Sequence, residues 1–157
     1  MTTTSIIVTF CIVTAANAGP AITVEVSNKP GDSFLSRIQA RDDTVTIDRM
    51  GKYAEQRLAQ FLKDCELPNN FTLTAKYEFA IGVEGKMEKD PIKDPEGRLL
   101  TIGGTAKLAY PRVKAVFNVA QDGEAVFSKT FQGGNFNGSR DWDGVKSVID
   151  MSIGHLM

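Results

Sequence analysis

Residues 71–88 read FTLTAKYEFAIGVEGKME, and this stretch decides the fold class. Apolar side chains occupy most odd positions from Phe71 to Met87, whereas threonine, lysine and glutamate occupy most of the even ones. This alternation with a period of two predicts a strand that rests one face on a core and turns the other to water. Such a strand is typical of an antiparallel sheet rather than of a buried parallel one. Gly82 and Gly85 predict a bend or a bulge near its end.

Further strands are predicted on both sides of this stretch. Residues 19–27 alternate in the same way, and residues 99–120 resume strand character, with Pro111 indicating an edge position or a bulge. Asp122-Gly123 favours a tight hairpin turn, so residues 125–131 are predicted as the returning strand and residues 133–138 as a loop. Residues 34–47 are predicted as irregular, with a short strand at 44–47.

Two amphipathic helices are predicted. Residues 48–65 carry one apolar stripe, with Asp48 as its N-cap and Pro68 as its stop signal. A second helix is predicted from Ser139 or Asp141 to the C-terminus, and its acidic first turn favours the positive end of the helix dipole. Both helices are expected to cover the apolar face of the sheet. The predicted fold is therefore α+β: a two-layer sandwich with a mostly antiparallel sheet of about four strands and two helices on one face.

The first eighteen residues differ from the rest of the chain. They contain no charged residue, the run from Ser5 to Ala16 is apolar, and Ala16-Asn17-Ala18 matches a signal-peptidase site. This pattern predicts a signal peptide over residues 1–18, a single α+β domain over residues 19–157, and a periplasmic or secreted location. A positively charged start is missing, however. The alternative is a core strand within Ile6–Val13, which predicts a cytoplasmic protein.

The composition excludes several classes of function. The chain has 157 residues, 18 of them basic and 19 acidic, and this balance lacks the basic surface of a nucleic-acid-binding protein. It also lacks the polybasic cluster that binds anionic membranes. Cys11 and Cys65 are too few for a disulfide scaffold or a cysteine-based metal site. We expect no cofactor, no metal, no nucleic-acid partner and no transmembrane segment in the mature chain.

The sequence contains no recognisable catalytic constellation. His155 is the only histidine and stands two residues from the C-terminus, where a general base is poorly positioned, so it is interpreted as an ordinary helix-end residue. Cys65 closes the apolar stripe of the first helix and is interpreted as a small buried hydrophobe. Asp42, Asp43 and Glu84 support an alternative hypothesis, a small carboxylate-dependent enzyme.

The candidate binding residues fall into two groups. Lys107, Arg112 and Lys114 form a basic stretch on one predicted strand, which is either a solvated face or a patch for an acidic partner. Trp142, the only tryptophan, is either a core anchor or, together with Phe136 in the glycine-rich loop, a contact site.

The order of the elements resembles that of known envelope proteins. The helix over residues 49–64 with the strand over 71–83, and the Asp122-Gly123 hairpin with the helix over 142–156, are similar to small αβ domains of Gram-negative envelopes. These include the YajG-type lipoproteins and the curli-secretion-lipoprotein-like fold. The resemblance implies a periplasmic or envelope-associated, non-enzymatic role in binding or assembly. Phe10 departs from the pattern, because a lipobox has a small residue before its cysteine, here Cys11.

The sequence therefore predicts an exported, non-enzymatic binding or assembly module of the bacterial envelope. A sheet edge, or the loops at 89–98 and 133–138, would contact a protein partner or a second copy of the chain. The alternatives are the carboxylate-dependent enzyme and, if residues 1–18 include a core strand, a cytoplasmic structural or assembly subunit.

Overall fold

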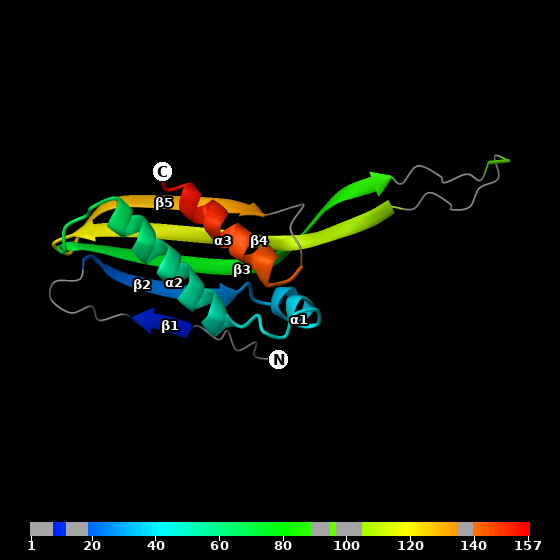
Figure 1. Cartoon of the computed structure of the whole chain (residues 1–157), viewed down its shortest axis with the longest axis horizontal. Helices are drawn as coiled ribbons and strands as arrows, with labels where there is room; N and C mark the ends of the chain where they lie inside the picture. Colours follow the sequence, from blue (N-terminus) through cyan, green and yellow to red (C-terminus); the bar gives the residue numbers. More distant parts are fainter. Residues whose placement is uncertain (1–7, 12–18, 89–94, 97–104, 135–139) are drawn as a thin grey trace.

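The computed structural model describes residues 8–11, 19–88, 95–96, 105–134 and 140–157; for residues 8–11, 83–88 and 105–109 the backbone alone is described. In this part of the chain five strands form one sheet in the order β1-β2-β3-β4-β5, and helices cover one of its faces (Figure 1). The elements are β1 (Val8–Cys11), β2 (Ala21–Asn28), α1 (Phe34–Gln39), α2 (Ile47–Asp64), β3 (Phe71–Glu88), β4 (Thr105–Gln121), β5 (Glu124–Gly134) and α3 (Trp142–Gly154).

The predicted α+β sandwich with a mostly antiparallel sheet is confirmed. α2 contacts β2 and α3, and α3 in turn contacts β4 and β5, so both long helices share one face of the sheet. The described sheet has five strands rather than about four, and α1 is a third helix. One pair is parallel: β2 runs beside β3 from Ala21↔Thr72 to Asn28↔Phe79. The crossover through α1 and α2 makes this parallel pairing feasible, because parallel neighbours need a long connection.

The prediction for residues 34–47 was wrong. Residues 34–39 form α1, and residues 44–46 precede α2 without forming a strand. Phe34 and Ile38, one helical turn apart, are fully buried, and the Phe34 ring stacks on Phe79 with 5.2 Å between centroids. A helix of six residues carries only two such apolar positions, which is too few to show a helical period in the sequence.

The core lies between the sheet and the helices, as the alternation in residues 71–88 predicts. Leu73, Ala75, Tyr77 and Phe79 of β3 are all buried. α2 covers them with a buried stripe that consists of Met50, Ala54, Leu58 and Leu62.

Two details of α2 differ from the prediction. Its N-cap is Thr46, which accepts a hydrogen bond from Arg49 N at 3.1 Å, and Asp48 lies in the first turn instead. Cys65 was expected to be buried but is an exposed free thiol. It follows the last helical residue as the C-cap, so it lies past the end of the packed stripe.

The β4–β5 hairpin forms as predicted. Asp122 and Gly123 both have positive φ, 51° and 83°, as a two-residue type I′ turn requires. β5 continues to Gly134, three residues past its predicted end. The predicted irregularity in β3 is also present as a register shift between Val83 and Lys86. Pro111 pairs with Ile81 of β3, and β5 pairing begins only at Arg112, so Pro111 needs no hydrogen bond on its β5 side.

Part of the N-terminal region forms an edge strand. β1 runs antiparallel to β2, from Val8↔Val26 to Cys11↔Thr23. With residues 1–18 retained, the chain has a strand within Ile6–Val13. The alternative interpretation expects a core strand there, and the burial of its side chains lies outside the described part. Signal cleavage after Ala18 stays a prediction, and the rest of residues 1–18 lies outside the described part.

Candidate functional site

The outer edge of β5 is the strongest candidate surface. β5 is the last strand of the sheet, and no other described strand pairs with its outer side (Figure 1). Val126 is 53% exposed and Phe127 is 44% exposed, which are high values for large apolar side chains in a strand. An edge strand directs every second pair of backbone N–H and C=O groups outward, where another strand can bind them. Proline and runs of charge, which usually block such edges, are absent from Glu124–Gly134.

α3 packs beside β5 and has one large exposed apolar side chain of its own. His155 caps the C-terminus of α3, and its ring lies against Phe131 of β5 with 5.4 Å between centroids. This contact agrees with the prediction of an ordinary helix-end histidine. Met151, one helical turn before His155 on the same side of α3, is 44% exposed.

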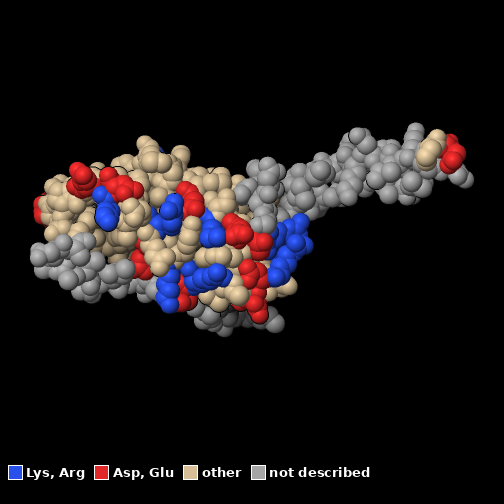
Figure 2. Space-filling model, viewed as in Figure 1, with Lys and Arg blue, Asp and Glu red and all other residues tan. Residues whose placement is uncertain are grey.

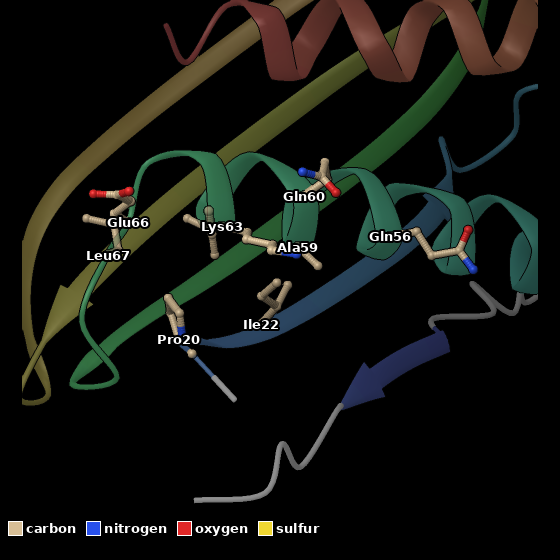
Figure 3. Close-up of a pocket in the computed structure, with 10 residues that line it drawn as sticks. Pro20, Ile22, Gln56, Ala59, Gln60, Lys63, Glu66 and Leu67 are labelled. Atoms are coloured by element: carbon tan, nitrogen blue, oxygen red, sulfur yellow. The ribbon is translucent and has the colours of Figure 1, made fainter. Parts of the chain in front are cut away.

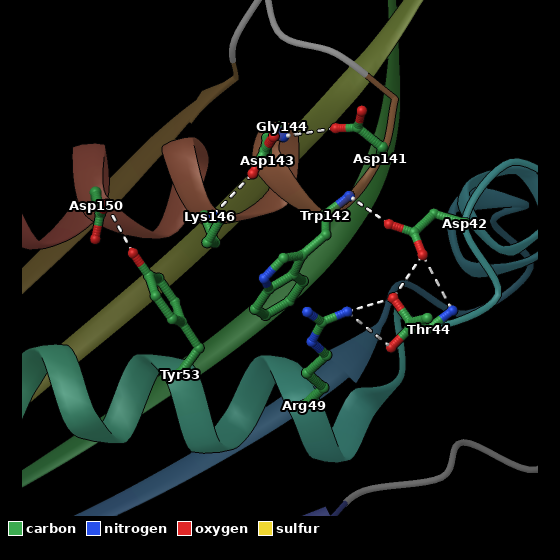
Figure 4. Close-up of polar contacts among 10 residues, drawn as sticks. All are labelled: Asp42, Thr44, Arg49, Tyr53, Asp141, Trp142, Asp143, Gly144, Lys146 and Asp150. Carbon is green, nitrogen blue, oxygen red and sulfur yellow. Dashed lines mark hydrogen bonds and ion pairs between the residues drawn. The ribbon is translucent and has the colours of Figure 1, made fainter.

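A second cluster joins the start of α3 to the loop before α2 (Figure 4). Asp42 accepts hydrogen bonds from Thr44 through Oδ1 and from the backbone N–H of Trp142 through Oδ2. These bonds, first that from the Thr44 hydroxyl and next that from Trp142, lower the pKa of Asp42. Asp141 caps the same helix by accepting a bond from Gly144 N at 3.2 Å. Asp42 therefore acts as a cap, and both of its oxygens are engaged.

Trp142 is half-buried within this cluster. Its ring meets the Tyr53 ring edge-on with 5.5 Å between centroids, and the Arg49 guanidinium lies 4.1 Å from its ring centre. Arg49 also donates hydrogen bonds to the hydroxyl and the carbonyl of Thr44. These contacts attach α3 to α2. They agree with the interpretation of Trp142 as a core anchor. Phe136, its predicted companion in a contact site, lies outside the described residues.

A clamp joins the middle of the two long helices (Figure 4). Asp150 of α3 accepts a hydrogen bond from the Tyr53 hydroxyl at 2.9 Å and one from Arg57 Nε at 2.8 Å. Burial, followed by the bond to Asp150, raises the pKa of Tyr53 to about 12. The Tyr53 phenol therefore stays protonated as a donor at neutral pH.

Two of the three basic residues predicted on β4, Arg112 and Lys114, lie on the face of the sheet opposite the helices. Arg112 and Lys114 are exposed there, but Lys114 pairs in register with Glu78, so the surface is mixed in charge rather than basic. A shallow hollow of about 190 Å³ lies beside them and is also lined by Asp32. The Lys107 side chain lies outside the described part. The helical face is mixed as well, with acidic and basic side chains interspersed (Figure 2).

Tyr110 is buried on the same face as Arg112 although that face is open. It lies across two glycines of the neighbouring strands: a Cβ placed on Gly82 or on Gly134 would come within 2.5 Å of its ring. These two positions therefore have to be glycine for the tyrosine to lie flat on the sheet.

An apolar groove of about 580 Å³ lies between α2 and the start of β2 (Figure 3). Ile22 and Leu62 form its floor, and Gln56, Ala59 and Lys63 line its α2 side. The groove borders on Gly19 at its β2 end.

The remaining candidate residues form no centre in the described part of the chain. Asp43 is exposed, and the side chain of Glu84 is not described. Among the described residues no group of three or more histidine, cysteine, aspartate or glutamate side chains could hold a metal ion. Of the loop at 89–98, the structure describes Pro95 and Glu96 alone, and both are exposed.

The β5 edge was not singled out in the sequence, although a signal for it exists. The alternation expected of the returning strand is broken by Ala125-Val126-Phe127, three apolar residues that begin one residue after the turn. Because successive side chains point to opposite faces, one such run has to expose apolar surface. The structure accommodates the run with a register shift between Val119 and Ala120 of the paired strand.

Comparisons with known proteins give no further information on the chain. No protein-family model matches it, and neither the curated proteins nor the solved structures give a significant match. The resemblance to small envelope domains thus stays a prediction. No helix among the described residues is long and apolar enough to span a membrane.

Proposed function

We propose that this chain is a non-enzymatic binding or assembly domain that acts by strand addition at the β5 edge. The observation that supports this proposal most directly is the exposure of Val126 and Phe127 on a strand whose outer side pairs with no described strand. A partner strand would form backbone hydrogen bonds with β5 and cover these side chains. Backbone bonding would supply affinity, and the two apolar side chains would supply selectivity.

The proposal is tested by capture on the immobilised full chain. Extract from the source cells is passed over the wild type and over the double variant Val126→Lys/Phe127→Lys, and retained proteins are identified by mass spectrometry. We expect the double variant to lose the retained partner, because two lysines on an edge oppose strand addition. Thr72→Lys, at an exposed position of the central strand β3, is the matched control and should retain the partner. Equal retention by all three proteins would refute a role for this edge.

We further propose that the domain is exported, on the basis of the uncharged N-terminal stretch and the Ala16-Asn17-Ala18 site. Cleavage there would remove β1 and leave the β2 edge unpaired, which adds a second edge for strand addition. The intact mass and N-terminal residue of the protein from fractionated cells test this. A start at Gly19 outside the cytoplasm supports export; a retained Met1 in the cytosol supports the cytoplasmic assembly subunit.

The carboxylate-dependent enzyme has less support. Asp42, its best-placed acid, uses both side-chain oxygens as hydrogen-bond acceptors within the fold. A carboxylate engaged in this way is poorly suited to take a proton from a substrate.

A further inference from the structure

Two copies of β5 that lie antiparallel can place opposite charges of the two chains against each other. From Phe127 toward the turn, the pairing with β4 runs Val119↔Phe127, Ala120↔Ala125 and Gln121↔Glu124. Two steps along β4 thus correspond to three residues of β5, because the bulge at Val126 adds one residue. In the other direction no residue is added, and Lys129 lies two steps from Phe127. Glu124 and Lys129 are therefore equally far from Phe127 along the ladder, on the same face of the sheet.

This spacing matters if a second β5 strand runs antiparallel to the first about a two-fold axis at Phe127. Phe127 then faces its own counterpart, and Glu124 of each chain lies opposite Lys129 of the other. Opposite charges that face each other across strands stabilise the pair, and an aromatic side chain facing its counterpart adds to this. A register centred on Lys129, the midpoint of β5, would instead place that lysine against itself. Of these two registers, the charges therefore favour the one centred on Phe127.

From this we infer that the chain pairs with a second copy of itself through antiparallel β5 strands, in the register centred on Phe127. The inference rests on the proposed strand-addition function and names its partner. Within the described residues neither Glu124 nor Lys129 takes part in an ion pair, so both are available to the second copy. The two-fold axis makes the contact self-limiting, since each chain uses its one β5 edge.

The expected dimer is weak. The register aligns residues 124–129 of both chains, which allows about four to six backbone hydrogen bonds, below the roughly ten of a typical stable interface. Exposed ion pairs at its ends add a modest amount each. We therefore expect a dissociation constant in the micromolar range rather than the nanomolar range.

Charge exchange provides the decisive test. Sedimentation equilibrium of the full chain is measured from about 1 µM to about 1 mM, which brackets the expected dissociation constant. Glu124→Lys and Lys129→Glu each turn two attractive contacts into repulsive ones and should weaken the dimer about tenfold. The exchanged double variant Glu124→Lys/Lys129→Glu restores both contacts and should return the dissociation constant to within about threefold of wild type. A full chain that is monomeric at the highest concentration, or an exchanged variant no tighter than the single variants, overturns the inference.

Cross-linking tests the register separately. In a chain with Cys11→Ser and Cys65→Ser, the variant Phe127→Cys should form an intermolecular disulfide, because residues directly opposite each other lie within its reach. Gln132→Cys, exposed on the same strand, lies five residues from the axis and should stay reduced. A disulfide in Gln132→Cys but not in Phe127→Cys overturns the register centred on Phe127.

Failure of this inference and failure of the proposed function give different results. If the wild type is monomeric but Val126→Lys/Phe127→Lys still abolishes capture of a different protein, the inference that the partner is a second copy is wrong. The proposal of strand addition at the β5 edge then stands. If the edge variants change neither self-association nor capture, both are wrong.

Discussion

The backbone N–H of Trp142 donates a hydrogen bond to Oδ2 of Asp42 at 3.0 Å, which joins the first turn of α3 to the loop before α2. The N–H groups in the first turn of a helix have no partner within the helix. Asp141 satisfies that of Gly144, and Asp42 satisfies that of Trp142 from a distant part of the chain. Correct docking of α3 and closure of the 42–46 loop therefore depend on each other.

We expect Asp42→Ala to lower the melting temperature by about 2–6 °C, because the substitution leaves the N–H of Trp142 without its acceptor. Asp43→Ala, an exposed neighbour, is the control and should change it by less than about 1 °C. The measurement is thermal unfolding followed by circular dichroism at neutral pH. If Asp43→Ala lowers the melting temperature as much as Asp42→Ala does, the capping role of Asp42 is contradicted.

The same bond has a defined pH dependence. The pKa of Asp42 in the native state is lowered below its usual value of 3.8, so the stabilisation by this bond is present above that value and is lost as the pH falls through the native pKa. Because the pKa is lowered in the native state, the difference in stability between the wild type and Asp42→Ala should be constant from pH 5 to 7. It should shrink below about pH 4, where the Asp42 carboxylate becomes protonated.

The fold was largely predictable from the sequence because its main elements are long and strongly periodic. The alternation in residues 71–88 and the apolar stripe that includes Met50, Leu58 and Leu62 both appear in the structure as buried faces. What escaped prediction is set by contacts between distant residues. α1 depends on the stacking of Phe34 on Phe79, and the parallel alignment of β2 with β3 depends on the crossover between them.

The candidate site was less predictable for the same reason. Whether Val126 and Phe127 are exposed depends on the position of β5 at the end of the strand order, which no local pattern specifies. Cys65 illustrates the opposite error, since it continues the helical stripe in sequence but lies beyond the last residue that the sheet covers. Hydrophobic periodicity in the sequence identifies the apolar face of a helix or strand. Whether another element covers that face depends on the tertiary arrangement.

The clamp between Tyr53 and Asp150 should contribute measurably to stability. Tyr53→Phe removes the hydroxyl donor and should lower the free energy of unfolding by about 1 kcal/mol. Arg57→Gln removes the other donor to Asp150, but that ion pair is about half exposed, so the loss should stay below about 0.5 kcal/mol. Urea unfolding at neutral pH gives both values. Equal losses of unfolding free energy in the two variants would contradict a larger contribution from the Tyr53 hydrogen bond than from the Arg57 ion pair.

Alkaline titration gives a second test of the Tyr53 bond. Its pKa is raised to about 12, so the bond stabilises the fold fully below pH 10 and is lost as the pH rises through about 12. Tyrosinate absorbance of the native wild type and of Tyr53→Phe should therefore coincide near pH 10 and diverge above pH 11, provided that the fold is intact by circular dichroism.

The glycine at 134 is expected to be required on steric grounds. A Cβ at this position would lie 2.5 Å from the Tyr110 ring and 2.7 Å from the Pro111 carbonyl oxygen, and a backbone atom cannot easily move away. Gly134→Ala should therefore destabilise the fold by about 1–3 kcal/mol, in the range of overpacked sites. Gly154→Ala is the matched control, because no atom lies within 4 Å of its added Cβ, and it should be neutral or slightly stabilising. Urea unfolding of both variants compares them directly.

Glu55 carries a buried carboxyl group whose charge is expected to destabilise the fold at neutral pH. The residue is 7% exposed, and its Oε1 has no hydrogen-bond partner in the described part of the chain. Burial raises the pKa of Glu55, an effect that the charge of Lys52 partly offsets. A raised carboxyl pKa means that the native state holds the proton more tightly than the unfolded state does. Stability is therefore greatest below the unfolded pKa and declines as the pH rises through the native one.

Glu55→Gln keeps the shape of the side chain and removes the charge. It should raise the free energy of unfolding by about 0.5–1 kcal/mol at pH 7 and by nothing measurable below about pH 4, where the wild-type carboxyl is protonated. Glu66→Gln, at an exposed position just after the same helix, should have no effect at either pH. Urea unfolding at the two pH values distinguishes this from a general effect of net charge, because both variants remove the same charge. A gain that persists at low pH would mean that Glu55 destabilises the fold through packing rather than through its buried charge.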